Sequence, residues 1–170
     1  MVPPLERIVS GGQTGADRAA LDIAIRHGIT HGGWCPKGRR AEDGPISSQY
    51  TLTETPSENY IQRTEWNVRD SDGTVVFTLD TDVTGGSLLT IEFAAKLRKP
   101  FLHLSRDRDA HPATLLNAFM RDNGTKTLNV AGSRESKEPG LYDWVTEVLT
   151  TAAKQDREYH GRQSRCRGSS

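Results

Sequence analysis

The fold is decided by one stretch, Ile8-Val9-Ser10-Gly11-Gly12-Gln13-Thr14-Gly15-Ala16-Asp17, in which a short apolar strand ends in a glycine-rich turn and the turn opens a helix. The first N–H groups of a helix have no partner within the helix, and the helix dipole adds roughly half a positive charge there. Glycines lack the Cβ atoms that would keep a ligand away from the backbone. The turn therefore predicts a site for phosphate or another oxyanion, formed by Gly11, Gly12, Gln13, Thr14 and Gly15. The alternative is a tight turn in which Thr14 or Asp17 caps the helix.

A second unit of the same kind begins at residue 75, where an apolar strand is followed by a loop, by Gly85-Gly86 and by a helix over 91–98. Ser87 and Thr90 add hydroxyl groups to this turn. Turns at the carboxyl ends of parallel strands face one crevice in an open α/β sheet, so we expect both turns to bind the same ligand. Glu92 is either a catalytic base or ligand contact, or a first-turn carboxylate that the helix dipole favours.

Basic side chains that follow other elements are expected to neutralise the ligand. Lys37, Arg39 and Arg40 lie in a loop after a short strand predicted near residue 30, Arg63 lies in a helix over 60–71, and Arg134 follows a strand over 127–132. The sequence predicts that four of them reach the anion: Lys37, Arg39, Arg63 and Arg134. The alternative for each is a solvated surface cation.

The length of 170 residues favours a single α/β domain over residues 1–154. Residues 41–61 form a long irregular connection, which is typical of a binding loop or lid. Residues 155–170 are polar with little to bury, so a frayed, disordered tail is expected there.

Composition narrows the class of protein. The 22 basic and 22 acidic residues cancel, so the overall charge indicates neither a nucleic-acid nor a membrane partner. No apolar run is long enough to span a bilayer, and the first seven residues contain no signal-peptide core. Cys35 and Cys166 lie far apart and outside any metal-ligand spacing, which fits a reducing cytoplasm. Cys35 is either a reactive thiol or metal ligand, or a small buried hydrophobic residue.

Six motifs together resemble one known family. They are Gly11–Asp17, Gly33–Arg39, Arg63-Thr64 with Asn67-Val68, Ser71–Thr74, Gly85–Ser87 with Thr90, and Asn129–Ser136. The combination is similar to the molybdenum carrier, or molybdenum-cofactor carrier, family, a circularly permuted YpsA-like branch of the SLOG superfamily. The resemblance covers residues 6–150.

The resemblance implies a Rossmann-like α/β subunit, an open parallel sheet with helices on both faces, in a homodimer or homotetramer. It implies binding of the molybdenum cofactor, a pterin with a dithiolene and a terminal phosphate, or of molybdate. It also makes molybdoenzymes or cofactor-biosynthesis proteins expected partners. Trp34 is then a candidate to flank the pterin ring, or else a core residue, and no protein ligand to the metal is required.

Three functions follow from these observations. The first is a carrier that holds an unstable cofactor and catalyses nothing. The second is an enzyme, since related phosphoribohydrolases carry a Pro-Gly-Gly-x-Gly-Thr-x-x-Glu motif. Here Gly85-Gly86 stands at the same distance from Glu92, without the leading Pro, the third Gly and the Thr. The third is a sensor of a nucleotide-derived ligand.

Overall fold

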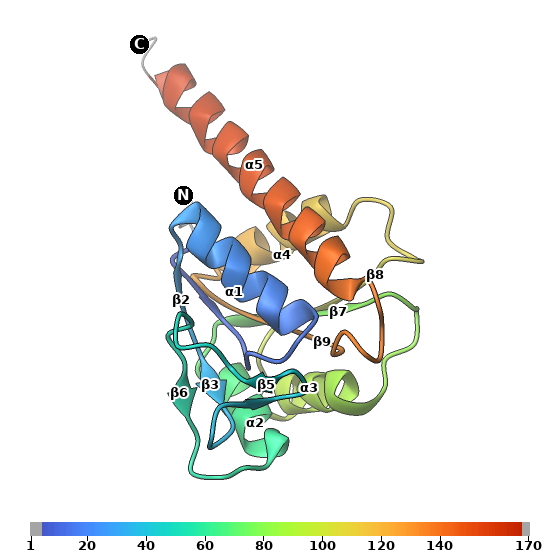
Figure 1. Ribbon diagram of the computed structural model, residues 1–170. Helices are drawn as coiled ribbons and strands as arrows, with labels where there is room; N and C mark the ends of the chain where they lie inside the picture. Colours follow the sequence, from blue (N-terminus) through green and yellow to red (C-terminus); the bar gives the residue numbers. More distant parts are fainter. Residues whose placement is uncertain (1–4, 168–170) are drawn as a thin grey trace.

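A five-stranded parallel sheet forms the centre of the molecule (Figure 1). The structure, a computed structural model, describes residues 5–167, and the side chains of its last helix up to residue 162. The sheet has the order β2-β1-β9-β7-β8, and every neighbouring pair is parallel. Its strands are β1 (Arg7–Val9), β2 (Thr30–Gly32), β7 (Gly73–Thr78), β8 (Phe101–Ser105) and β9 (Thr127–Gly132).

Helices cover both faces of this sheet, as the sequence predicts. On one face α1 (Ala16–His27) and α4 (Pro112–Asp122) pack against α5 (Leu141–Arg167), and on the other α2 (Tyr60–Arg69) packs against α3 (Gly85–Lys96) (Figure 1). The strands are short apolar runs because both of their faces are covered, and all six residues of β7 are buried. The fold class is thus confirmed as α/β and Rossmann-like.

Two small sheets lie beside the central one. Strand β3 (Trp34–Cys35) pairs with β6 (Thr53–Glu54), and β4 (Arg40–Ala41) forms a hairpin with β5 (Gly44–Pro45). They enclose a second apolar cluster in which Leu21, Cys35, Ile46 and Tyr50 are buried. Cys35 has no exposed surface, and burial raises the pKa of its thiol. It is therefore a small core residue, the second of the two interpretations given above.

The last helix is longer than the sequence predicts. Residues 155–167, expected to be a frayed tail, continue α5, and residues 168–170 lie outside the described part. This stretch carries side-chain pairs four residues apart on the helix, with 3.4 Å between Asp156 and His160 and 3.6 Å between Glu158 and Arg162. The guanidinium of Arg121 on α4 also lies 5.4 Å from the ring centre of Tyr159. The sequence analysis expected a tail because this stretch has no apolar stripe, but polar contacts hold it as a helix.

Within residues 5–167, no helix combines the length and apolar composition needed to cross a bilayer.

Candidate functional site

The turn after β1 is folded around a carboxylate of its own chain. The side chain of Asp17 is buried, and its Oδ2 accepts the N–H of Gln13 and an N–H of Arg63, each at 3.3 Å. Burial raises the pKa of Asp17, while the charge of Arg63 and the backbone N–H groups oppose this shift. Asp17 thus takes an N–H that the sequence analysis offered to a ligand. This bond joins Asp17 to the turn and is not a helix cap, since the start of α1 has no side-chain capping bond.

Arg63 reaches the turn from α2, as the sequence predicts. A Cβ atom at Gly11 would lie 2.0 Å from Nη1 and 2.5 Å from Cζ of Arg63, so the glycine is needed for this close approach. Nε of Arg63 is buried and has no hydrogen-bond partner among the described residues. Arg63 therefore combines an ion pair with one donor still available.

Gln13 and Thr14 hold a neighbouring loop in place. The side-chain oxygen of Gln13 accepts the N–H of Thr14 at 3.0 Å and the N–H of Glu42 at 2.9 Å. The hydroxyl of Thr14 donates to the Glu42 carboxylate and accepts the N–H of Glu135 at 3.1 Å. The side-chain oxygen of Gln13 and the hydroxyl of Thr14 are thus engaged within the chain.

Arg134 is paired with the same carboxylate. It lies 3.7 Å from Glu42, which also accepts the N–H of Ser136 at 3.1 Å and the hydroxyl of Ser136. Burial alone would raise the pKa of Glu42, but the bonds from Ser136 and Thr14 and the charge of Arg134 outweigh it, so the pKa is lowered. Glu42, which the sequence analysis did not single out, therefore joins the loop after β9 to the turn after β1.

Lys37 and Arg39 do not join this group. Lys37 is exposed. The Arg39 guanidinium donates to four backbone carbonyls, those of Ile46, Ser47, Tyr50 and Leu52, at 2.8 to 3.3 Å. Arg39 thus anchors the segment 41–61 that the sequence analysis expected as a binding loop or lid.

The first turn of α3 keeps unpaired polar groups. Its N-cap residue, Thr84, makes no side-chain capping bond, and a Cβ atom at Gly86 would meet nothing within 4 Å. Ser87 is 3% exposed, and its hydroxyl has no partner among the described residues. Thr90, by contrast, donates to the Gly86 carbonyl at 2.8 Å. Of the two predicted hydroxyls, Ser87 is the one still able to bind a ligand.

A lysine that the sequence analysis missed stands beside this turn. Nζ of Lys137 donates to the Thr84 hydroxyl at 2.8 Å and lies 3.5 Å from a Cβ position built on Gly85. Lys137 follows β9, whose place between β1 and β7 sets its loop between the two glycine turns. The only feature of the sequence that could have indicated Lys137 is its position three residues after Arg134, in the same loop.

The residue named for an enzymatic function lies apart from this turn. Glu92 is exposed on α3, whereas Ser87 and Thr90 are buried. Glu92 lies five residues after Ser87, which rotates its side chain by about 140° around the helix and so places it on a different face of α3.

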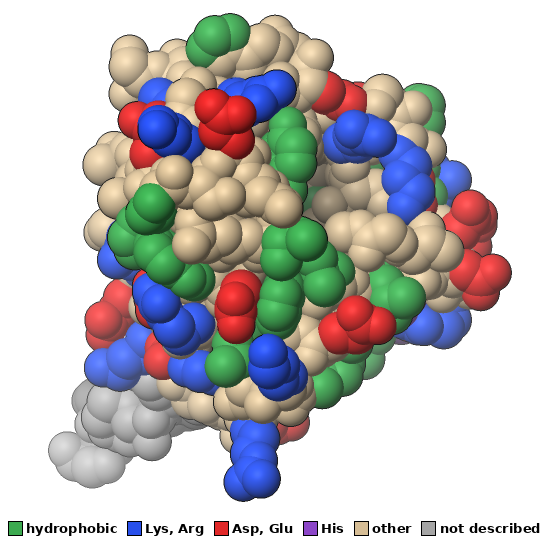
Figure 2. Space-filling model, turned by 90° about the horizontal axis from the view of Figure 1, so that it is seen from below, with side chains coloured by type: hydrophobic (Ala, Val, Ile, Leu, Met, Phe, Trp, Pro, Cys, Tyr) green, Lys and Arg blue, Asp and Glu red, His purple; other side chains and the backbone are tan. Residues whose placement is uncertain are grey.

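Figure 2 shows the side of the molecule that carries α2 and α3, where Lys and Arg side chains stand beside a hollow in the surface.

Comparison with known proteins agrees with the motifs and the fold. Residues 8–153 match the model of the circularly permutated YpsA SLOG family. A crystal structure from Syntrophus aciditrophicus SB, named "Putative molybdenum carrier protein", is 46% identical with a TM-score of 0.86, over 88% of this chain and 96% of that one. A search of curated proteins gave no match. Since the family model spans most of the sequence, the chain belongs to the circularly permuted YpsA family of the SLOG superfamily.

Proposed function

We propose that this protein binds an anionic molybdenum compound, molybdate or the phosphate-bearing molybdenum cofactor, and carries it without chemical change. The observation that carries the proposal is the first turn of α3, where the uncapped helix start coincides with the buried, unpartnered hydroxyl of Ser87. Helix N-termini favour anions through their free N–H groups and the helix dipole. The similar solved protein is named as a putative molybdenum carrier, and that name also points to molybdenum as the cargo.

Two cations support an anion at this turn. Lys137 is held beside it through Thr84, and Arg63 stands on α2, which packs against α3. Arginine and phosphate form charge-assisted bonds that are about twice as strong as neutral ones. The turn after β1 supplies the ion pair that holds Arg63 in place instead of binding the ligand through its own N–H groups.

Binding of molybdate to matched variants tests the proposal. Equilibrium dialysis with metal analysis is carried out on the wild type, on Ser87→Ala and on Thr90→Val. Ser87→Ala removes the unpartnered hydroxyl and is expected to weaken molybdate binding about tenfold, since a hydrogen bond to a charged group is worth about 1.5 kcal/mol or more. Thr90→Val, whose hydroxyl is already bonded to Gly86, is expected to bind as the wild type does.

Analysis of the protein purified without oxygen tests the nature of the cargo. Stoichiometric molybdenum with a pterin identifies the intact cofactor, and molybdenum alone identifies the oxyanion.

Two kinds of result would contradict the proposal. Equal molybdate binding by Ser87→Ala and Thr90→Val would reject the α3 turn as the binding site. Release of a free base from a nucleoside monophosphate would replace the carrier with an enzyme, and a retained nucleotide without turnover would indicate a sensor.

A further inference from the structure

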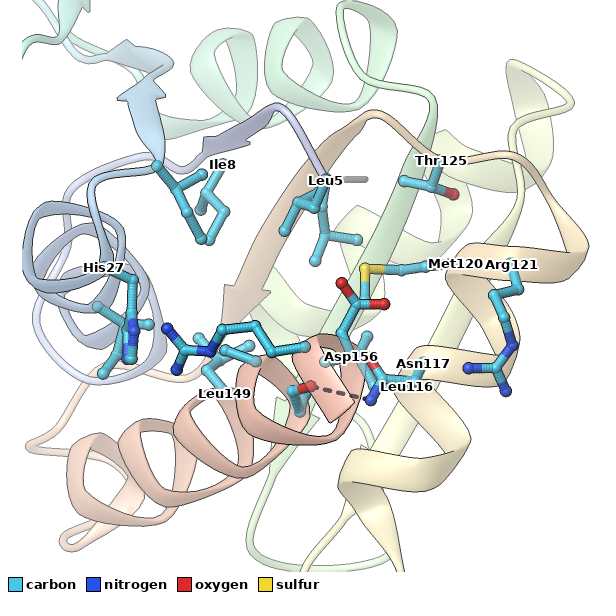
Figure 3. A pocket seen from close by; sticks show the side chains of 16 residues that line it. Leu5, Ile8, His27, Leu116, Asn117, Met120, Arg121, Thr125, Leu149 and Asp156 are labelled. Carbon is cyan, nitrogen blue, oxygen red and sulfur yellow. Dashed lines mark hydrogen bonds between the residues drawn. The ribbon is translucent and has the colours of Figure 1, made fainter. Parts of the chain in front are cut away.

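A cavity of about 220 Å³ lies between α1, α4 and α5 and the sheet (Figure 3). Most of its wall is aliphatic and comes from the sheet and from all three helices, with Ile8, Ile23, Leu116, Leu128 and Leu149 among the lining residues. An engineered cavity of about 150 Å³ with such a lining binds benzene. The space described here is large enough for two fused rings.

The cavity lies at the amino ends of the strands, and the proposed anion site lies at their carboxyl ends. Leu5 precedes β1, Ile29 precedes β2 and Thr125 precedes β9, so these lining residues stand at the amino ends of the strands. The glycine turns and Lys137 follow the carboxyl ends of β1, β7 and β9. A ligand in this cavity is therefore independent of the proposed carrier function.

Three buried polar atoms around the cavity have no partner among the described residues: Nε2 of His27, Oδ1 of Asn117 and Oγ1 of Thr125. Asn117 and Thr125 are only 4% and 2% exposed. A buried polar atom left without a hydrogen bond costs about 1–3 kcal/mol. Three such atoms around one apolar space indicate a site that is completed by a bound molecule.

The structure fixes which atom Asn117 offers. Its Nδ2 donates to the Ala152 carbonyl at 3.0 Å and to Oε1 of Gln155 at 3.3 Å. A flipped amide would place oxygen against these two oxygens, so the free atom is the acceptor Oδ1. The molecule that completes the site must therefore supply a donor.

The titratable lining groups favour an uncharged ligand. Burial and the nearby cations Arg157, Arg26 and Lys154 lower the pKa of His27, which disfavours the charged form of the ring. Arg121 and Arg157 are accompanied by Asp156, so the lining holds charges of both signs. Asp156 and Arg157 stand on the part of α5 beyond residue 153, where the match to the family model ends.

We propose that this cavity is a second ligand site that takes a small, uncharged, two-ring heteroaromatic molecule with an N–H donor. Its ring system fills the aliphatic space, its N–H is donated to Oδ1 of Asn117, and its remaining polar edge meets Thr125 or His27. Figure 3 shows His27 on one side of the cavity and Asn117 and Thr125 on the other.

Titration of the full chain with indole tests this site, with benzothiophene as a probe of the same shape but without an N–H group. Calorimetry is expected to show saturable indole binding and benzothiophene binding at least fivefold weaker, the loss of one hydrogen bond of about 1 kcal/mol. Ala153→Leu places a larger side chain at the cavity wall and is expected to abolish binding. Ala95→Leu, at an exposed position of α3, is the matched control and should bind as the wild type does.

Thr125→Val is a second variant that still tests the cavity if Ala153→Leu disturbs the packing of the protein. It removes an unpartnered hydroxyl at nearly constant shape, so its melting temperature should not fall. Indole, whose one N–H is given to Asn117, should bind this variant as it binds the wild type, whereas benzimidazole, which adds an acceptor nitrogen, should bind about fivefold more weakly. Ser87→Ala should leave indole binding unchanged, which separates this site from the proposed function. Absence of indole binding, or binding that Ala153→Leu leaves intact, would overturn the proposal.

Discussion

At the scale of single residues, two glycines with positive φ differ in what a side chain would cost. Gly28 lies in the left-handed region with φ 65° and ψ 26°, whereas Gly15, with φ 78° and ψ −129°, lies outside it. A Cβ atom at Gly15 would lie 2.4 Å from the carbonyl oxygen of Ser133, whereas one at Gly28 would meet nothing within 4 Å. Only the first substitution therefore forces neighbouring backbone to move.

We expect Gly28→Ala to lower the free energy of unfolding by about 1–2 kcal/mol, the cost of a left-handed L-residue. Gly15→Ala should lose at least about 2 kcal/mol more, because the loop after β9 must move and because the backbone of Gly15 lies outside the left-handed region. Urea denaturation of both variants measures the difference. Equal losses would mean that the contact between Gly15 and Ser133 is not tight in solution.

The bonds of Glu42 predict a specific dependence on pH. Its pKa is lowered in the folded protein, so its contribution to stability is present above the pKa of the unfolded chain and is lost as the pH falls through the folded pKa. The gap in unfolding free energy between the wild type and Glu42→Gln should therefore narrow as the pH falls from about 6 to about 3. Ser136→Ala, which removes one of the donors, should show a smaller narrowing. Parallel curves for the wild type and Glu42→Gln would contradict the assignment.

Residue types in the sequence identify candidates for a site but not their partners. Arg63 and Arg39 are both arginines that the sequence analysis expected to reach the anion. In the structure one lies on Gly11 with an unpaired Nε, while the other binds backbone carbonyls. The sequence could not distinguish them because the decisive partners, Asp17 and the carbonyls of 46–52, are set by tertiary packing.

At the scale of elements, the outer part of α5 is the main addition to what the sequence predicts. The strands of the central sheet and the first four helices were expected from the sequence, whereas β5 and β6 lie in the segment expected to be irregular. Gly28, for example, ends α1 in the left-handed conformation. Residues 155–162 carry no comparable apolar signal. Their contacts are polar ones to Asn117 and Arg121 on α4, and such contacts are not visible in a pattern of hydrophobic residues.

Removal of residues 154–170 tests the contribution of this part of the helix. We expect a folded protein with less helical circular dichroism and a free energy of unfolding lower by about 1–2 kcal/mol, since a hydrogen bond to Gln155 and a cation–π contact with Tyr159 are lost. Arg162→Ala, which breaks only an exposed ion pair with Glu158, should leave stability nearly unchanged. A truncated protein as stable as the wild type would show that the contacts with α4 contribute nothing.

At the scale of the whole molecule, the sequence predicts the layers but not the order of the strands. Buried strands that alternate with helices require a parallel sheet covered on both faces. The pattern does not reveal that β9 lies between β1 and β7, because apolar content does not specify which strands are neighbours. That order determines the site, since it brings Lys137 and Glu135 between two turns that lie about seventy residues apart in the sequence.

The position of β9 also has a consequence for synthesis on the ribosome. Arg7 and Gly73 pair with Thr127 and Leu128 of this strand, so neither β1 nor β7 has its central neighbour until most of the chain has been made. Pairings that are distant in sequence slow folding and leave strand edges exposed meanwhile. The pairs β1–β2 and β7–β8 must therefore avoid pairing with strands of other chains until β9 leaves the exit tunnel and joins them.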